Sequence, residues 1–335
     1  MTEGSTAPAK TRTLRAPAKI NLGLRLMGVR DDGYHTLESV FAPIEIWDEL
    51  TLRISPGELS IDLVMDSAVS DELPAALAAV SAGPENLVVR AAAAFCKETG
   101  LEARIGLRLR KRIPVGAGLG GGSSDAAAVL LGLASLFEGK LTNRTLHAMA
   151  LSLGADVPFF LSPGPALVTG IGEKIDPLSG IPPLDLVVVN PGISLSTAEV
   201  FRAADALGST SGGALGGAFG GTSGGALTEP NPGSTMRAIS QLCGETGDFS
   251  PALGELLVND LESAAKRLCP PVGRLLNRLT QVGAIGVSMS GSGSTVYGVF
   301  ASKGRALEAA DELRDSEPAE SWIRVTRIIT SGESR

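Results

Sequence analysis

Cysteine, aromatic residues and long apolar runs are all scarce in this sequence. Three of its 335 residues are cysteines, Cys96, Cys243 and Cys269, and they form no CxxC or Cys/His spacing. The sequence therefore predicts neither a disulfide framework nor a zinc site. The longest apolar run, AAAVLLGLASLF at residues 126–137, is too short for a membrane span of about 20 residues. Because residues 1–13 also lack the apolar segment of a secretory signal, we expect a cytoplasmic protein with reduced thiols.

Positive charge is not in excess either. The chain has 29 Lys and Arg residues against 36 Asp and Glu residues, a formal net charge of -7, so it lacks the overall basic character of a nucleic-acid-binding protein. The stretch RLRKR at residues 108–112 is locally basic and leaves nucleic-acid binding as the weakest alternative. Apolar residues make up 44% and charged residues 19%, which is typical of a soluble globular protein. A chain of 335 residues favours two domains over a single core.

Helical and strand-like patterns mix along the chain without the regular alternation of a Rossmann or barrel protein. Alternating apolar residues predict strands, which begin at Leu14 and recur at 37–54, 104–111, 183–192 and 322–329, with a strand–turn–strand unit at 282–300. Helical patterns and capping residues predict helices at 86–100, 126–137, 142–154, 196–207 and 302–314. This mixture favours the α+β class.

Residues 208–227 have a different composition. The tetrapeptides GGAL, GGAF, GGTS and GGAL follow one another there, and nine of the twenty positions are glycine. The few apolar residues cannot offset the conformational entropy lost on ordering. The sequence therefore predicts a flexible surface insertion.

A second glycine-rich stretch, PVGAGLGGGSSDAAAVL at residues 114–130, comes just before an alanine-rich helix. Glycine lets backbone N–H groups approach a ligand closely, and a helix start carries unpaired N–H groups and partial positive charge. We therefore predict an anion site for the phosphates of a nucleotide. The stretch lacks the lysine of a Walker A motif, and it follows several strands instead of opening a Rossmann unit. A tight turn without a ligand is the alternative, although so much glycine is costly without a reason.

Two charged residues stand out in apolar surroundings. Asp156, in the segment GADVPFF, is a candidate general base for phosphoryl transfer, because removal from water makes a carboxylate a better base. A helix cap or turn residue is the structural alternative for this acid. Lys19, in APAKINLGL, lies on an otherwise apolar strand, where a charge needs a partner. A lysine at a strand edge is the alternative for Lys19.

Three segments together resemble the GHMP kinase superfamily, which includes galactokinase, homoserine kinase and mevalonate kinase. The glycine-rich stretch at 114–124 is similar to the ATP motif, and GVSMSGSGSTVYGVF at 286–300 is similar to the C-terminal motif. The stretch PAKINLGLRLMGVRDDGYHTLESVF at 17–41 resembles a member that phosphorylates the 2-hydroxyl of a methylerythritol unit carrying cytidine diphosphate. That reaction belongs to the non-mevalonate route to isoprenoid precursors. The resemblance covers residues 13–330 apart from the insertion.

The resemblance implies a two-domain α+β fold with the active site in the cleft between the domains. On this basis residues 13–175 would form the N-terminal ATP-binding domain and residues 176–333 the C-terminal substrate domain, which carries the insertion at 208–227. Residues 1–12 would form a disordered tail. The implied partners are ATP, with Mg²⁺ expected, and a small molecule with a cytidine diphosphate group, without nucleic acid or membrane.

The resemblance also assigns roles to particular residues. Asp156 would be the catalytic base, and Lys19 would hold it ionised while stabilising the transferred phosphoryl group. Asn21, Tyr34, His35 and Phe201 match substrate-contacting positions, with Tyr34 and Phe201 on the two faces of the cytosine ring. The positions that match ATP contacts are Lys111, Pro114, Val115, Gly116, Ala117, Gly118, Leu119, Gly120, Gly121, Gly122, Ser123 and Ser124.

Several alternatives remain open for these residues and for the whole chain. Lys111 also fits a solvated strand end, His35 a turn, and Phe201 a helix core. No acidic pair is evident as a magnesium site, for which Ser124 is one candidate ligand. For the chain as a whole, the alternatives are another small-molecule kinase, of the homoserine or mevalonate type, and a catalytically silent nucleotide-binding module.

Overall fold

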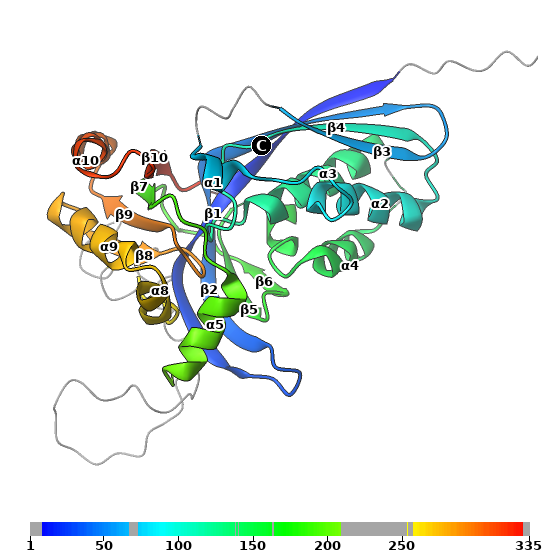
Figure 1. Ribbon diagram of the computed structural model, residues 1–335. Coiled ribbons are helices and arrows are strands. Elements are labelled where there is room, and N and C mark those ends of the chain that lie inside the picture. The colour runs from blue at the N-terminus through cyan, green and yellow to red at the C-terminus, as the bar shows by residue number, and fades with distance from the viewer. Residues whose placement is uncertain are drawn as a thin grey trace, which may run out of the picture.

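A computed structural model describes residues 9–66, 73–137, 139, 141–162, 164–208, 253 and 257–330. This part of the chain forms two β-sheets, one of six strands and one of four. Figure 1 shows the smaller sheet with its helices on the left and the larger sheet with its helices on the right. The mixture of helices with mainly antiparallel sheets, in which only β3 and β4 of the described strands pair in parallel, confirms the predicted α+β class.

The larger sheet has the strand order β3-β4-β2-β5-β6, and β1 pairs along the other edge of β2. Its strands are β1 (Lys10–Val29), β2 (His35–Ser55), β3 (Ser60–Met65), β4 (Arg104–Arg110), β5 (Ala166–Gly170) and β6 (Lys174–Pro177). Two helices pack against it, α2 (Leu87–Thr99) and α3 (Gly121–Leu136), and α4 (Asn143–Leu153) packs against these two helices. Two short helical segments complete this half, α1 (Ala75–Ala78) and the 3₁₀ turn η2 (Pro158–Leu161).

Local sequence explains the helices beside this sheet. Asn86 caps α2, because its side chain accepts a hydrogen bond from the N–H of Val88, and Gly100 ends the helix in the left-handed conformation. The α3 helix is buried over most of its length. Its alanines let it lie close to β1 and α2, which are its most extensive neighbours.

The smaller sheet is antiparallel throughout, with the order β10-β7-β9-β8. Its strands are β7 (Asp185–Asn190), β8 (Gly286–Met289), β9 (Val296–Phe300) and β10 (Trp322–Arg327). The helices of this half are α5 (Thr197–Ala206), α8 (Glu262–Leu268), α9 (Pro271–Gln281) and α10 (Lys303–Ser316). The apolar residues of β7 and β9 are buried on both faces, as expected for central strands.

A shared apolar core joins the two sheets. Ile20 and Val40 from the larger sheet lie in one buried cluster with Leu186 and Tyr297 from the smaller sheet. The long strands β1 and β2 run through the middle of the molecule to the hairpin at the bottom of Figure 1. This arrangement places the residues of β1 between the glycine-rich stretch and the C-terminal half of the chain.

Two of the predicted boundaries need correction. Residues 10–12, predicted to be part of the tail, belong to β1, where they pair with residues 52–54 of β2. Their side chains are polar and show no hydrophobic periodicity, but the backbone hydrogen bonds of a strand need none. The predicted domain boundary at 175/176 falls inside β6, which pairs with β5. The chain therefore passes to the second sheet between β6 and β7.

The remaining predicted tail, residues 1–8, and the insertion, apart from Gly208, lie outside the described residues. Within the described ranges, no helix combines the length and apolar character needed to cross a bilayer.

Candidate functional site

A cavity of about 540 Å³ lies between the two halves of the molecule. Its wall includes Lys19 and Asn21 from β1, Asp156 from the segment before η2, and Phe201 from α5. Most of the predicted ATP-binding positions also line it: Lys111, Pro114, Val115, Gly116, Ala117, Gly118, Gly120, Gly121, Gly122 and Ser123. The structure therefore brings both catalytic candidates and the glycine-rich stretch to one space of the size typical for a small-molecule site.

The glycine-rich stretch forms an open loop that leads into α3. Gly116, Gly118 and Gly120 have positive φ angles of 63°, 77° and 70°, which favour glycine. The α3 helix begins at Gly121, and no side chain caps it. The first N–H groups of an α-helix have no acceptor within the helix, so they remain available for an anion. The loop thus has the conformation expected of a phosphate-binding loop.

Gly118 is also a point of close contact between the two halves of the molecule. The Ser290 hydroxyl donates a hydrogen bond of 2.9 Å to the Gly118 carbonyl. A Cβ atom at Gly118 would lie 2.1 Å from the backbone oxygen of Ser290. Glycine is therefore required at this position both by the φ angle and by the second Gly/Ser turn, residues 290–295, which follows β8.

We expect Gly118→Ala to destabilise the protein more than Gly100→Ala and to reduce activity at least about tenfold. Both glycines have positive φ, but a Cβ atom at Gly100 would have no neighbour within 4 Å. Gly100→Ala therefore reports only the left-handed conformation, which costs about 1–2 kcal/mol. Thermal melts and initial rates of the two variants check the prediction. Equal losses of stability with unchanged activity would show that the contact between the two turns is not needed.

Lys19 and Asp156 lie next to each other in the wall of the cavity. The Lys19 side chain is 4% exposed, and its Nζ lies 3.7 Å from Oδ2 of Asp156. It also donates a 2.7 Å hydrogen bond to Oδ1 of Asn21 and lies 4.5 Å from the ring centre of Phe41. Burial lowers the pKa of Lys19, and the nearby Asp156 carboxylate opposes this effect. The pair is therefore held together inside an apolar part of the wall.

The expectation of a buried acid at position 156 is wrong. The Asp156 side chain is 35% exposed and faces the cavity, so the buried member of the pair is the lysine. The apolar residues of GADVPFF explain the difference, because Val157, Phe159 and Phe160 enter the core and leave the acid at the surface of the cavity. An accessible carboxylate is suited to meet a substrate hydroxyl.

Asn21 lies in the wall, but its side chain is already engaged. Its Oδ1 accepts from Lys19, and its Nδ2 donates to the hydroxyl of Ser39 at 2.8 Å. Its backbone oxygen accepts a 2.7 Å hydrogen bond from the hydroxyl of Tyr297. The amide of Asn21 therefore orients Lys19, in addition to any contact it makes with a substrate.

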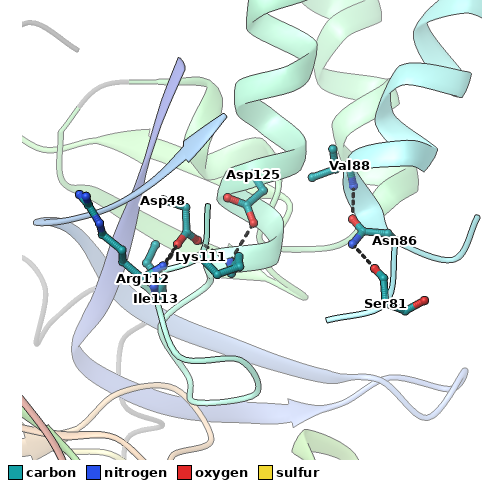
Figure 2. A network of polar contacts seen from close by, with 8 residues as sticks. All are labelled: Asp48, Ser81, Asn86, Val88, Lys111, Arg112, Ile113 and Asp125. Carbon is teal, nitrogen blue, oxygen red and sulfur yellow. Dashed lines mark hydrogen bonds and ion pairs between the residues drawn. The ribbon is translucent and has the colours of Figure 1, made fainter. Parts of the chain in front are cut away.

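Lys111 is neither a solvated strand end nor a free cation. Its ammonium donates to Oδ2 of Asp48 and, at 2.8 Å, to Oδ2 of Asp125 (Figure 2). Burial lowers the pKa of Lys111, but the carboxylates of Asp125 and Asp48 outweigh it, so the net pKa is raised. For Asp125, burial raises the pKa, Lys111 lowers it and Asp48 raises it again, so the net pKa lies above the usual value.

The sequence prediction includes neither acid of this group. Asp48 stands next to Glu49 in the stretch IEIWDEL, so its sequence context does not single it out in the way that an apolar strand singles out Lys19. Asn86 is a further residue of the cavity wall that the sequence prediction does not include among the site residues. Figure 2 shows its side chain between the Ser81 carbonyl, to which it donates at 2.7 Å, and the N–H of Val88. The start of α2 is thereby fixed beside the glycine loop.

The predicted aromatic pair is only half present at the cavity. Phe201 lines it, but Tyr34 does not and is 62% exposed in the turn between β1 and β2. His35 lies against Phe201 instead, with ring centres 4.8 Å apart, and its Nε2 lies 2.8 Å from Oδ1 of Asp205. The structure therefore brings His35 and Phe201 together and leaves Tyr34 apart from them.

Two predicted ATP-binding residues lie away from the cavity. Leu119 is buried, and its carbonyl accepts a 2.9 Å hydrogen bond from the N–H of Lys19. Ser124 lines a separate cavity of about 260 Å³ between β1 and α3. The Ser124 hydroxyl is buried, with no hydrogen-bond partner within the described part of the chain. Ser123, one residue earlier, is the serine that faces the larger cavity.

The acidic groups near the loop bear on the expected magnesium ion. Within the described ranges, no three His, Cys, Asp or Glu side chains come together as a metal site. Magnesium bound with a nucleotide takes most of its ligands from phosphates and water, with one or two carboxylates. The Asp156 carboxylate and the Ser123 hydroxyl of the cavity wall fit that small contribution.

Comparison with known proteins gives matches over nearly the whole chain. Residues 86–164 match the family model of the GHMP kinases N terminal domain, and residues 236–319 match that of the GHMP kinases C terminal region. The 4-diphosphocytidyl-2-C-methyl-D-erythritol kinase of Geobacter metallireducens is 38% identical over 92% of this chain and 95% of its own length.

Two solved structures match this chain, one at a high and one at a low sequence identity. A crystal structure of 4-(cytidine 5'-diphospho)-2C-methyl-D-erythritol kinase matches with a TM-score of 0.69 and 34% identity, over 95% of this chain and 99% of that one. The homoserine kinase of Cytophaga hutchinsonii matches with a TM-score of 0.67 and 18% identity, over 96% of each chain. The second match shows the fold alone.

Proposed function

The chain belongs to the 4-diphosphocytidyl-2-C-methyl-D-erythritol kinase family of GHMP kinases, and we propose that it phosphorylates the 2-hydroxyl of that family's namesake substrate with ATP. It is a small-molecule kinase with the two-domain GHMP fold. The observation that carries the proposal is the Lys19–Asp156 pair, which lies in the wall of the same cavity as the glycine loop. The product would be an intermediate of the non-mevalonate route to isoprenoid precursors.

Asp156 would act as the general base. Its partly exposed carboxylate takes the proton of the substrate's 2-hydroxyl as that oxygen forms a bond to the γ-phosphorus of ATP. The bond between the γ-phosphorus and the bridging oxygen breaks, and ADP leaves with the electron pair. Lys19 keeps Asp156 ionised and places a positive charge near the transferred oxygens.

ATP would bind with its phosphates on the glycine loop and the start of α3. The contacts come from the backbone N–H groups of residues 116–123, which the positive-φ glycines bring close to the cavity. Magnesium, when bound, neutralises charge on the phosphates. The base and ribose then extend toward Asn86 and the start of α2, which form the far wall of the cavity.

The cytidine end of the acceptor would bind near α5 and the β1–β2 hairpin. Phe201 offers one aromatic face to the cytosine ring, and His35 lies beside it. Tyr34 is proposed as the second face. Because it is exposed in the turn between the strands, it must approach Phe201 when the substrate binds.

A coupled assay for ADP release tests the proposal. We expect rapid turnover with ATP and 4-diphosphocytidyl-2-C-methyl-D-erythritol, and at most slow turnover when homoserine or mevalonate replaces it. Release of ADP with homoserine or mevalonate alone would identify a different kinase. Nucleotide binding without transfer to any of these acceptors would identify a catalytically silent module.

The pH profile of kcat offers a further test of the pair. Burial lowers the pKa of Lys19 below its ordinary value of 10.5. As the pH rises, Lys19 should therefore lose its proton, and kcat should fall, before pH 10.5 is reached. Asp156 is the group that raises this pKa, so Asp156→Asn should shift the alkaline fall of the residual rate to still lower pH. Initial rates between about pH 7 and pH 11 measure both shifts. An alkaline limb at or above the ordinary lysine value would exclude Lys19 as its source.

A further inference from the structure

Three buried charged side chains close the base of the glycine loop. Lys111 stands just after β4 and before the loop, Asp125 lies near the start of α3 just after the loop, and Asp48 belongs to β2. We call these three residues the Lys111 clasp. The exposed fractions of their side chains are 7%, 2% and 0%, respectively, so the three charges interact almost without water.

The clasp fixes both ends of the loop. Oδ1 of Asp48 accepts hydrogen bonds from the N–H groups of Arg112 at 2.6 Å and Ile113 at 2.9 Å. Oδ2 of the same carboxylate accepts from Lys111, which also donates to Asp125 at 2.8 Å. Figure 2 shows the ammonium of Lys111 between the two acids, below the first turn of α3. The Asp48 carboxylate thus orients the chain that enters the loop. The Lys111 ammonium joins that carboxylate to Asp125 in the helix that follows the loop.

This geometry does not favour a direct contact between the Lys111 ammonium and ATP. Two of the three N–H donors of the Lys111 ammonium are taken by the buried carboxylates, and turning the ammonium away from them toward the phosphates would break a buried ion pair, which is strongly destabilising. A loop with this much glycine also loses much conformational entropy when it is ordered. Fixing its two ends lowers the entropy that must be lost on ligand binding.

We propose that Lys111 is a positioning residue and not an ATP ligand. Through Asp48 and Asp125 it holds the glycine loop in the phosphate-binding conformation before ATP arrives. Asp48 and Asp125 share this role, although Asp48 does not itself line the cavity. The proposal rests on the proposed function in one respect, that ATP binds at this loop.

The test measures the Kd of a non-hydrolysable ATP analogue, together with the Tm, in the absence of any acceptor. Lys111→Met leaves the two acids facing each other and should raise the Kd about tenfold or more while lowering the Tm. Adding Asp125→Asn removes one of the two charges. Because the two carboxyl groups already interact, the new amide can donate to Asp48. The double variant should therefore recover most of both the Tm and the affinity.

Arg110→Met is the matched control, because it removes a neighbouring cation whose partner Glu49 keeps its bond to Arg112. It should change neither quantity appreciably. Recovery of the Tm without recovery of affinity in the double variant would overturn the proposal and make Lys111 an ATP ligand. A lower Tm with unchanged affinity in Lys111→Met would also overturn it, because the clasp would then serve folding alone.

Asp48→Asn decides the question if Lys111→Met does not fold. It keeps an acceptor oxygen for the N–H groups of Arg112 and Ile113 but removes the negative charge that holds Lys111. A positioning role predicts weaker binding of the ATP analogue, whereas a ligand role predicts unchanged or tighter binding because the ammonium is released. Absence of binding by the wild-type protein would contradict the proposed function and not the clasp.

Discussion

Asp156→Asn is expected to lower kcat by about 10²-fold or more, which is the usual contribution of a positioned general base. The KM values for ATP and for the acceptor should remain within a few-fold, because asparagine keeps the size and polarity of the side chain. The Tm should fall as well, because Lys19, whose side chain is 4% exposed, loses its ion-pair partner at 3.7 Å. Steady-state kinetics with both substrates varied, together with a thermal melt, measure these effects.

Asp176→Asn serves as the matched control for this substitution. Asp176 is an exposed acid on β6 of the same sheet, so its replacement should leave kcat unchanged. A variant at position 156 with near-normal kcat would remove the base from the mechanism and leave positioning of the acceptor as the role of Asp156. A large rise in KM with kcat preserved would likewise assign Asp156 to binding.

The sequence predicts the central part of the site because its signals are local. A run of glycines before an alanine-rich helix has few structural uses, and the loop at 114–124 adopts the expected positive φ angles. A charge in an apolar segment is also unusual in itself, so Lys19 and Asp156 can be singled out one by one, although only Lys19 is buried. Their distance of 3.7 Å required the structure, because 136 positions separate them in the sequence.

The sequence could not show which side chains are already paired. The sequence leaves two interpretations of Lys111, an ATP contact and a solvated strand end, and the structure adds a third, because its partner Asp48 lies 63 positions earlier. The same limit applies to Asn21, whose amide binds Lys19 and Ser39. Hydrogen-bond partners depend on the packing of strands that are distant in the chain, and residue type alone does not specify them.

Several elements of the fold also lack a strong sequence signal. The β3 strand is short and half-exposed, so its alternation is weak. By contrast, α9 shows a clear pattern that the sequence prediction does not include. It begins with Pro271 and buries Leu275, Leu276 and Leu279 on one face, which is typical of an amphipathic helix with proline in its first turn.

The two glycine-rich turns, residues 114–124 and 290–295, contact each other and so join the two halves of the molecule. The Ser290 hydroxyl binds the Gly118 carbonyl, and Asn259 donates to the carbonyls of Met289 and Gly291 at 2.8 Å each. The second turn therefore supports the glycine loop at Gly118, whereas the clasp fixes its two ends. A loop with many glycines can be held in one conformation when its ends and its middle are fixed by separate contacts.

Phe201→Ala is expected to raise the KM for the cytidine substrate by about 5- to 150-fold, because stacking of a base on an aromatic ring is worth about 1–3 kcal/mol. The KM for ATP should change little, since ATP is proposed to bind at the glycine loop elsewhere in the cavity. Phe201 is partly buried beside the core of the smaller sheet, so Phe201→Leu, which keeps apolar packing without the ring, separates stacking from folding. A loss of Tm with normal KM in the folded fraction would make Phe201 a core residue.

Tyr34→Ala completes the test of the cytosine site. Tyr34 is 62% exposed, so its loss should leave the Tm unchanged, and any rise in the KM for the cytidine substrate must come from binding. A rise comparable to that of Phe201→Ala would mean that the β1–β2 turn moves toward α5 when the substrate enters. An unchanged KM would leave Phe201, with His35 already 4.8 Å from its ring, as the surface on which the cytosine stacks. The acceptor would then bind against a face that exists before it arrives.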